Sequence, residues 1–122
     1  MQPNKHRTWA EIDLGAIEHN YRVICEAAKA PVLCVVKADC YGHGAVPVAN
    51  RLQSMGAPYF AVATVPEAVE LRENGIEKPI IILGYIDEAD MDTVAENGIT
   101  APVYDEETAE LLSAAAVRTG RD

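Results

Sequence analysis

Basic residues are scarce in this sequence of 122 residues, in which ten lysines and arginines stand against nineteen acidic residues. The formal charge of −9 disfavours nucleic acids and anionic membranes as partners, because both repel a strongly acidic protein. Cysteine is scarce as well, since Cys25, Cys34 and Cys40 are an odd number of thiols in no metal-binding spacing. We therefore expect reduced thiols in a cytoplasmic protein, without a disulfide framework and without a bound metal.

Long apolar runs are also missing from the sequence. Met1–Thr8 is polar and lacks the apolar core of a signal peptide, and no later segment approaches the length of a membrane span. These absences predict a soluble chain, although a piece cut from a larger membrane protein would share them. The chain is 49% hydrophobic, which provides for a modest core. It is too short for a complete eight-unit α/β barrel, which needs about 250 residues.

The sequence does contain a repeated strand-and-helix pattern. Its four short apolar runs are candidate strands, at 32–36, 59–63, 79–83 and 99–103. They begin about 20 to 27 residues apart, which is the spacing of successive units in a parallel α/β fold without an internal domain boundary. The continuous apolar character of the first run predicts a strand buried on both faces. Pro102 fits a central strand poorly, so the fourth run is predicted to be an edge strand or to end there.

Helices are predicted between these strands. Asp13 suits the N-cap of the first helix, Thr64 and Glu67 form a capping box for the third, and Asp87 is expected to cap the fourth. The predicted helices are 14–30, 45–55, 64–74, 87–97 and 105–115. Ahead of them, Trp9–Asp13 alternates apolar and acidic residues, which predicts a short half-exposed strand.

Lys37 stands where the first apolar run ends, and Tyr41, Gly42 and Gly44 follow it. The carboxyl ends of parallel strands are the places where α/β proteins bind ligands. A lysine there is most often solvated, but it can also bind an anion or attack a carbonyl to form a Schiff base. The last use is how proteins hold pyridoxal phosphate. Tyr41 can then donate to a phosphate oxygen, and the glycines allow the loop to turn tightly.

The stretch Val35–Gly44 closely resembles the pyridoxal phosphate lysine motif of the alanine racemase family, whose usual form is Val-Lys-Ala-(Asn or Asp)-Ala-Tyr-Gly-His-Gly. Cys40 replaces the usual alanine and is a candidate for a reactive thiol beside the site. The resemblance extends across nearly the whole chain, because further stretches agree in order and spacing. These are Arg7–Leu14 with Asn20, Phe60–Ala63 with Glu67-Ala68 and Leu71-Arg72, and Pro79–Gly84.

This resemblance implies a fold and a chemistry. Members of the family are (β/α)8 barrels of the TIM type that bind pyridoxal phosphate, carry a carboxyl-terminal β domain and work as homodimers. Residues 1–122 are then expected to be the amino-terminal part of the cofactor-binding barrel domain, with about four of its eight units preceded by a short strand and helix, and without the β domain. The implied reaction interconverts L- and D-alanine and supplies D-alanine for peptidoglycan.

The resemblance also carries residue roles. Lys37 matches the lysine that forms the internal aldimine with the cofactor and moves a proton at the α carbon of the substrate. Tyr41 matches the tyrosine that contacts the cofactor phosphate, and Leu83 matches a residue that packs near the cofactor ring. Asp39 and His43 belong to the motif, and we expect them to shape the loop.

Other machinery of the family has no counterpart in this sequence. It includes the second base, a tyrosine from the carboxyl-terminal domain of the partner subunit, and the arginine at the pyridine nitrogen. We therefore expect the chain to be an incomplete and inactive fragment when isolated. A serine or broad-specificity racemase of the same family stays open, as do a non-catalytic pyridoxal phosphate-binding barrel protein and a plain α/β module with a solvated Lys37.

Overall fold

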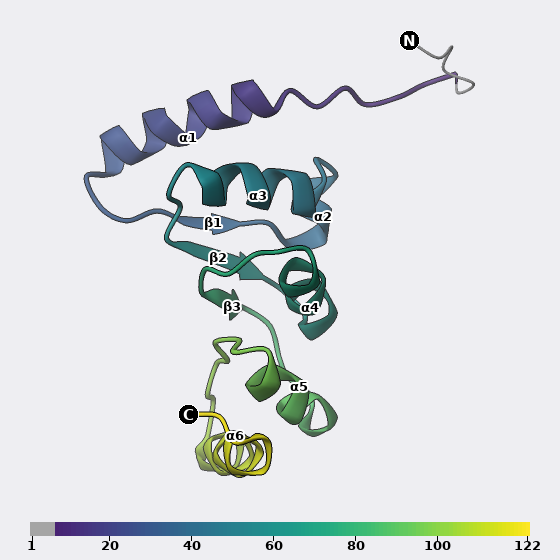
Figure 1. Cartoon of the computed structure of the whole chain (residues 1–122), viewed down its shortest axis with the longest axis vertical. Helices are drawn as coiled ribbons and strands as arrows, with labels where there is room; N and C mark the ends of the chain where they lie inside the picture. The colour runs from purple at the N-terminus through teal and green to yellow at the C-terminus, as the bar shows by residue number, and fades with distance from the viewer. Residues whose placement is uncertain (1–6) are drawn as a thin grey trace.

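The computed structural model describes residues 7–122 and contains a three-stranded parallel sheet (Figure 1). The strands are β1 (Leu33–Val35), β2 (Tyr59–Val62) and β3 (Ile80–Ile82), and they pair in chain order. Val35 is in register with Ala61, and Ala61 with Ile81. The predicted parallel α/β arrangement is confirmed.

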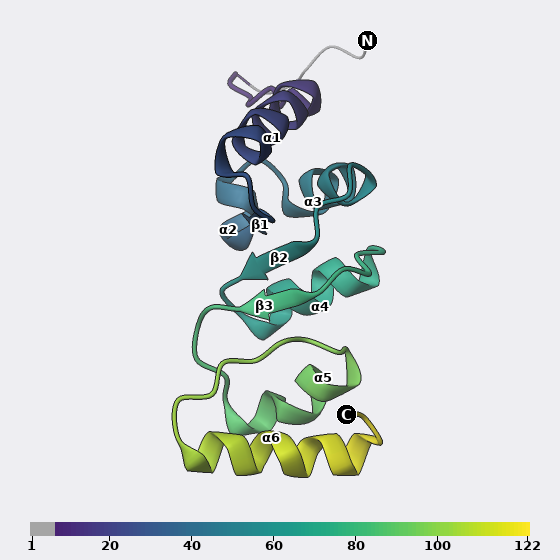
Figure 2. The ribbon, with the colours of Figure 1, turned by 90° about the vertical axis from the view of Figure 1, so that its left-hand side faces the viewer.

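Helices connect the strands and flank them. The helices are α1 (Leu14–Ala28), α2 (Lys37–Tyr41), α3 (Ala45–Ser54), α4 (Val65–Glu73), the 3-10 turn η1 (Glu88–Asp90), α5 (Met91–Glu96) and α6 (Glu106–Thr119). Figure 1 shows the elements stacked from α1 at the top to α6 at the bottom, and Figure 2 shows α5 and α6 side by side. No helix among residues 7–122 is long and apolar enough to cross a membrane.

Local sequence chemistry explains where the helices begin and end. The Asp13 carboxylate caps α1 as predicted, because it accepts the backbone N–H groups of Gly15 at 2.8 Å and Ala16 at 3.1 Å. Helix α3 ends at the predicted place, since Gly56 adopts a φ of 91° just beyond it. Asp87 does not fulfil its prediction, because it precedes η1 and its side chain makes no capping hydrogen bond.

One face of the sheet is packed against the helices. Alternate strand residues on this face are buried and form one cluster with the inner sides of α3, α4 and α5. The members from the strands and their ends are Cys34, Val36, Phe60, Val62, Ile80 and Ile82. Burying this apolar surface is the main stabilising contribution to the fold.

The opposite face of the sheet is exposed over β1 and at the start of β2, whereas Ala61 in the middle of the sheet is buried. Leu33 and Val35 of β1 are each 37% exposed, and Tyr59 of β2 is also exposed. The prediction that the first strand is buried on both faces is therefore wrong for this chain. The reason is that no element among residues 7–122 covers this side, which would be the interior of a closed barrel.

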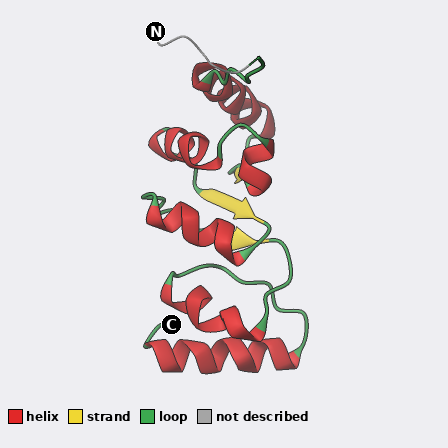
Figure 3. Ribbon diagram, turned by 90° about the vertical axis from the view of Figure 1, so that its right-hand side faces the viewer, coloured by secondary structure: helices red, strands yellow, loops and turns green. Residues whose placement is uncertain are grey.

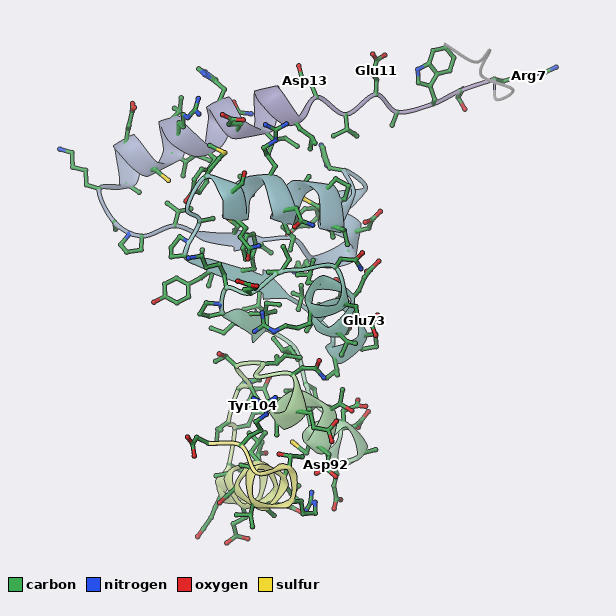
Figure 4. The ribbon with its side chains drawn as sticks, viewed as in Figure 1. Arg7, Glu11, Asp13, Glu73, Asp92 and Tyr104 are labelled. Atoms are coloured by element: carbon green, nitrogen blue, oxygen red, sulfur yellow. The ribbon has the colours of Figure 1, made fainter. Side chains whose placement is uncertain are left out.

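Two predicted strands are absent or reduced. Trp9–Asp13 is an extended segment without a strand, because it makes no ladder hydrogen bond with any described part of the chain. Figure 4 shows Asp13 and Glu11 on this segment, and Arg7 ahead of it, as the chain leads away from the body of the protein. The fourth run, 99–103, is a loop in Figure 3 with a single bridge between Thr100 and Ile81. Pro102 has no N–H to extend that bridge, in line with the reservation about a central strand.

The loop that leads into β3 and the turn after α5 are joined by side-chain hydrogen bonds. Arg72, in the last turn of α4, donates to the backbone carbonyls of Ile76, Lys78, Asn97 and Gly98 at distances between 2.7 and 3.0 Å. Gln53 accepts the backbone N–H of Glu77 at 2.8 Å and of Lys78 at 3.2 Å. Burial lowers the pKa of Arg72 from its ordinary value. These hydrogen bonds make the amino end of the sheet rigid.

Candidate functional site

Lys37 lies at the carboxyl end of β1, as the sequence predicted. The strand pairing continues one residue beyond β1, because the Val36 N–H donates to the Ala61 carbonyl at 2.9 Å. Val36 is buried, and the next residue, Lys37, is half-buried. The ion pairs among the described residues are Arg22–Glu18, Arg51–Glu18 and Arg118–Asp92, so none of them involves Lys37. The ammonium is thus held at the sheet edge without a carboxylate partner in the described part of the chain.

The backbone after Lys37 makes a left-handed turn that sequence reasoning missed. Ala38, Asp39, Cys40 and Tyr41 all have φ between 50° and 55°. Residues with a Cβ atom lose about 1 to 2 kcal/mol each in this conformation, so the turn persists only where other contacts impose it. The sequence predicted only a tight loop, because alanine, cysteine and tyrosine carry no local preference for positive φ.

Hydrogen bonds inside the loop impose part of this conformation. The Gly44 N–H donates to the Asp39 carbonyl at 2.9 Å, and the Ala45 N–H donates to Asp39 Oδ1 at 2.8 Å. Asp39 thereby caps the first turn of α3, where Gly44 has no side chain to offer. His43 Nδ1 donates to the Cys40 carbonyl at 2.9 Å. The side chains of Asp39 and His43 therefore both form hydrogen bonds with the loop backbone.

A side chain from the next strand-and-helix unit holds the start of the turn. The Ala38 N–H donates to Glu67 Oε2 at 2.7 Å, and the Thr64 hydroxyl donates to Glu67 Oε1 at 2.9 Å. The Glu67 N–H donates to the Thr64 hydroxyl oxygen at 3.4 Å. The predicted capping box is therefore only half formed, because the carboxylate takes the Ala38 N–H in place of an N–H of its own helix.

Tyr41 and Leu83 lie at the carboxyl end of the sheet, as Lys37 does, and both are exposed. Tyr41 is 62% exposed, and its hydroxyl makes no hydrogen bond with residues 7–122. Leu83 follows β3, is 52% exposed, and donates its N–H to the Val62 carbonyl at 2.8 Å. The structure thus brings both predicted residues to the carboxyl end of the strands, together with Lys37, with their side chains exposed.

Gly84 allows the ends of β2 and β3 to come close. A Cβ atom on Gly84 would lie 2.5 Å from the Ala63 carbonyl oxygen, which real structures do not tolerate. The Tyr104 hydroxyl donates to the Gly84 carbonyl at 2.9 Å and links this turn to the segment before α6 (Figure 4). Glycine at this position is therefore needed for packing at the strand ends.

The cysteines near the site are protonated thiols at neutral pH. Burial, and then the neighbouring Asp39 carboxylate, raise the pKa of Cys40. Burial, with Cys25 and Cys40 nearby, raises the pKa of Cys34 to about 11. A thiol reacts as its thiolate, so these environments argue against the reactive Cys40 that the sequence suggested.

The residues at this end fit an aldehyde cofactor with a phosphate group. The unpaired amine of Lys37 is the nucleophile that an aldehyde requires, and the exposed hydroxyl of Tyr41 is a donor for phosphate oxygen. The apolar Leu83 side chain offers a surface for a planar ring. This donor set suits pyridoxal phosphate and does not resemble a metal site, which needs several carboxylate, imidazole or thiolate ligands.

Comparisons with known proteins agree with this geometry. A family profile described as "Alanine racemase, N-terminal domain" matches residues 12–122. The alanine racemase of Symbiobacterium thermophilum is 43% identical over 115 residues, which cover 93% of this chain and 30% of that protein. The alanine racemase of Desulfovibrio desulfuricans is 46% identical over 114 residues, which cover 92% of this chain and 31% of that protein.

A solved structure also has the same fold. The alanine racemase of Clostridium difficile 630 in complex with cycloserine superposes with a TM-score of 0.90 at 40% identity, over 96% of this chain and 33% of that one. The parallel strands and helices therefore match the amino-terminal part of the barrel, as predicted. The chain spans about 30% of the length of the curated relatives it matches. From the profile over residues 12–122 and these relatives, we conclude that the chain belongs to the alanine racemase family, whose amino-terminal domain it matches.

Proposed function

We propose that this chain is the amino-terminal part of an alanine racemase and that Lys37 is the residue to which pyridoxal phosphate attaches. The observation that carries the proposal is the position of Lys37, which is half-buried at the carboxyl end of β1 and unpaired among residues 7–122. Two curated relatives named alanine racemase, at 43% and 46% identity, support alanine as the substrate.

Each site residue has a role in this proposal. The bound cofactor supplies a ring that stabilises negative charge at the carbon next to the substrate nitrogen. Lys37 holds the cofactor and then moves a proton at the α carbon of alanine on one face. Tyr41 donates its hydroxyl to the phosphate, and Leu83 packs near the ring. Asp39 and His43 keep the loop between Lys37 and α3 in shape.

The remaining parts of the enzyme lie outside the 122 residues in this proposal. They are the later barrel units, the carboxyl-terminal β domain and a second base from the partner subunit of a homodimer. The open face of the sheet, with Leu33 and Val35 exposed, supports the later barrel units as its cover. The proposed setting is the cytoplasm, where the product D-alanine serves peptidoglycan synthesis.

The alternative substrates and roles receive less support. Neither the relatives named above nor the matched family profile favours a serine or broad-specificity racemase, or a non-catalytic cofactor-binding barrel. A plain α/β module with a solvated lysine does not account for a strained left-handed turn directly after Lys37.

Cofactor binding can be tested on the 122-residue chain. Pyridoxal phosphate is titrated into the chain while the absorbance of the lysine-bound cofactor is followed. We expect a saturable change that Lys37→Ala abolishes and that Lys78→Ala leaves intact, because Lys78 is exposed at the opposite end of the sheet. A change that survives Lys37→Ala would contradict the proposal.

Turnover is the second test, because the proposal places one of the two bases outside this chain. The isolated chain is mixed with pyridoxal phosphate and L- or D-alanine, and the optical activity is followed by circular dichroism. We expect little or no racemisation. Appreciable turnover would show that residues 1–122 contain both bases, which would refute the division of the site between two parts of the protein.

A further inference from the structure

The left-handed turn after Lys37 is held only in part by hydrogen bonds within its own loop. Ala38 is the first of four consecutive non-glycine residues with positive φ, and its N–H is the first donor after the lysine. The hydrogen bonds from Gly44 and Ala45 to Asp39 act further along the turn. The Cys40 N–H donates to the Val36 carbonyl at 3.0 Å and closes the turn around the Lys37–Ala38 peptide, but the Ala38 N–H finds its acceptor outside the loop.

Glu67 is that anchor among residues 7–122. Its Oε2 accepts the Ala38 N–H at 2.7 Å, across 29 residues of sequence. A hydrogen bond from an N–H to a carboxylate is about twice as strong as one between neutral groups. The carboxylate also makes no ion pair with a described residue, so it acts on the backbone and not on the Lys37 ammonium.

The position of Glu67 on α4 fixes the direction of its carboxylate. The side chain is half-buried in the first turn of the helix, where the positive end of the helix dipole favours a negative charge. The Thr64 hydroxyl donates to Oε1 and leaves Oε2 for Ala38. Helix α4 begins directly after β2, which pairs with β1, so its first turn lies beside the end of β1.

We propose that Glu67 is a positioning residue for Lys37: it holds the Lys37–Ala38 peptide in place and so directs the lysine amine toward the cofactor aldehyde. The inference rests on the proposed function, because it assumes that Lys37 receives the cofactor. Glu67 itself touches neither substrate nor cofactor. Its contribution passes through one backbone hydrogen bond, and an amide oxygen at the same place can replace the carboxylate oxygen.

The test compares three variants of the full 122-residue chain. Glu67→Ala removes the acceptor, Glu67→Gln keeps an acceptor oxygen without the charge, and Glu70→Ala removes an exposed carboxylate from the same helix as a control. The first readout is hydrogen exchange of the Ala38 amide by NMR. The Ala68 amide, which donates to the Thr64 carbonyl at 3.2 Å, reports whether α4 stays intact.

We expect the Ala38 amide to exchange at least about tenfold faster in Glu67→Ala, with Ala68 unchanged, because loss of a charged acceptor removes the bond that protects it. Glu67→Gln should restore most of the protection, and Glu70→Ala should match the unmodified chain. Unchanged exchange at Ala38 in Glu67→Ala would overturn the inference. So would equal acceleration at Ala38 and Ala68, because Glu67 would then serve only the helix.

The second readout is the rate at which pyridoxal phosphate, followed by borohydride, labels Lys37. We expect labelling to slow about tenfold in Glu67→Ala and to recover in Glu67→Gln, in step with the exchange result. Unaltered labelling despite faster exchange would show that the anchor does not position the lysine. Failure to label Lys37 in the unmodified chain would contradict the proposed function instead, and the exchange result would then decide the anchoring separately.

Discussion

Helix α4 holds neighbouring loops at both of its ends, and the two ends do so differently. In the last turn, Arg72 donates to four backbone carbonyls, two in the loop that leads into β3 and two in the turn after α5. In the first turn, Glu67 accepts a single N–H, from the residue after Lys37. The side chains of α4 thus hold the amino end of the sheet with four hydrogen bonds and the carboxyl end with one, on a strained turn.

This difference matches the division of labour in α/β barrels. Loops at the amino ends of the strands contribute to stability, and loops at the carboxyl ends carry ligands and chemistry. Here the carboxyl end also leaves Tyr41 and Leu83 exposed, whereas the Arg72 guanidinium is partly buried among carbonyls. The contrast predicts that loss of Arg72 lowers stability without changing cofactor binding, and that loss of Glu67 slows cofactor attachment at Lys37.

Arg72→Ala is expected to have the largest effect on stability. Four carbonyls lose a charged donor, so the free energy of unfolding should fall by about 2 to 3 kcal/mol in urea denaturation. The free energy of unfolding of Arg72→Lys should lie between those of Arg72→Ala and the unmodified chain, since an ammonium cannot span four acceptors. Labelling of Lys37 by pyridoxal phosphate should stay the same under folding conditions. An unchanged unfolding midpoint would break the comparison between the two ends.

Gly84→Ala should have the next largest effect. The new methyl group would lie 2.5 Å from the Ala63 carbonyl oxygen, and relieving this overlap should cost about 1 to 3 kcal/mol. Gly15→Ala is the matched control, because the nearest atom, Asp13 Oδ1 at 3.1 Å, belongs to a side chain that can shift. Equal unfolding midpoints for the two variants would show that the strand ends at Gly84 are not closely packed.

Asp39→Ala should have a smaller effect that is confined to the carboxyl end. Loss of the acceptor for the Ala45 N–H removes the cap of α3, which is worth about 1 kcal/mol. Asp39→Asn keeps an oxygen acceptor and should behave like the unmodified chain. Exchange of the Ala45 amide measures the change directly. Full protection of that amide in Asp39→Ala would show that Asp39 does not cap α3.

The smallest effect is a pH dependence at α6, remote from both ends of α4. The Asp105 carboxylate accepts the Thr108 hydroxyl at 2.6 Å and the Thr108 N–H at 2.8 Å, and these bonds lower its pKa. Because the folded pKa is depressed, the contribution is present above the unfolded pKa of about 4 and is lost as pH falls through the folded pKa. Asp105→Asn should flatten this part of the stability profile, and an unaltered profile would contradict the assignment.

The sequence predicted the parts of the fold that depend on local patterns. Continuous apolar runs identified β1 to β3, and the side chains of Asp13 and Thr64 marked helix starts that the structure confirms. The fourth strand and the Trp9–Asp13 strand were wrong because strand formation depends on a partner. Thr100 makes one bridge to Ile81, and no described residue pairs with Trp9–Asp13.

The site was predictable only in part, for a related reason. Lys37 could be placed at a strand end from the apolar run before it, and the motif resemblance added Tyr41 and Leu83. The Glu67 contact could not be foreseen, since its partner lies 29 residues away and its sequence context indicated an ordinary capping box. The left-handed turn over Ala38–Tyr41 was also not foreseen, because the Glu67 contact and hydrogen bonds within the loop impose it, and local propensity does not.

The central claim is that chemistry belongs to the carboxyl end of the sheet, at Lys37. It is tested most directly by treating the folded 122-residue chain with limiting pyridoxal phosphate, reducing with borohydride, and mapping the labelled lysines by peptide mass spectrometry. Lys29 and Lys78 are exposed lysines away from the carboxyl ends of the strands and serve as internal references. The structure predicts that Lys37 carries nearly all of the label. Equal labelling of Lys29, Lys37 and Lys78 would contradict it.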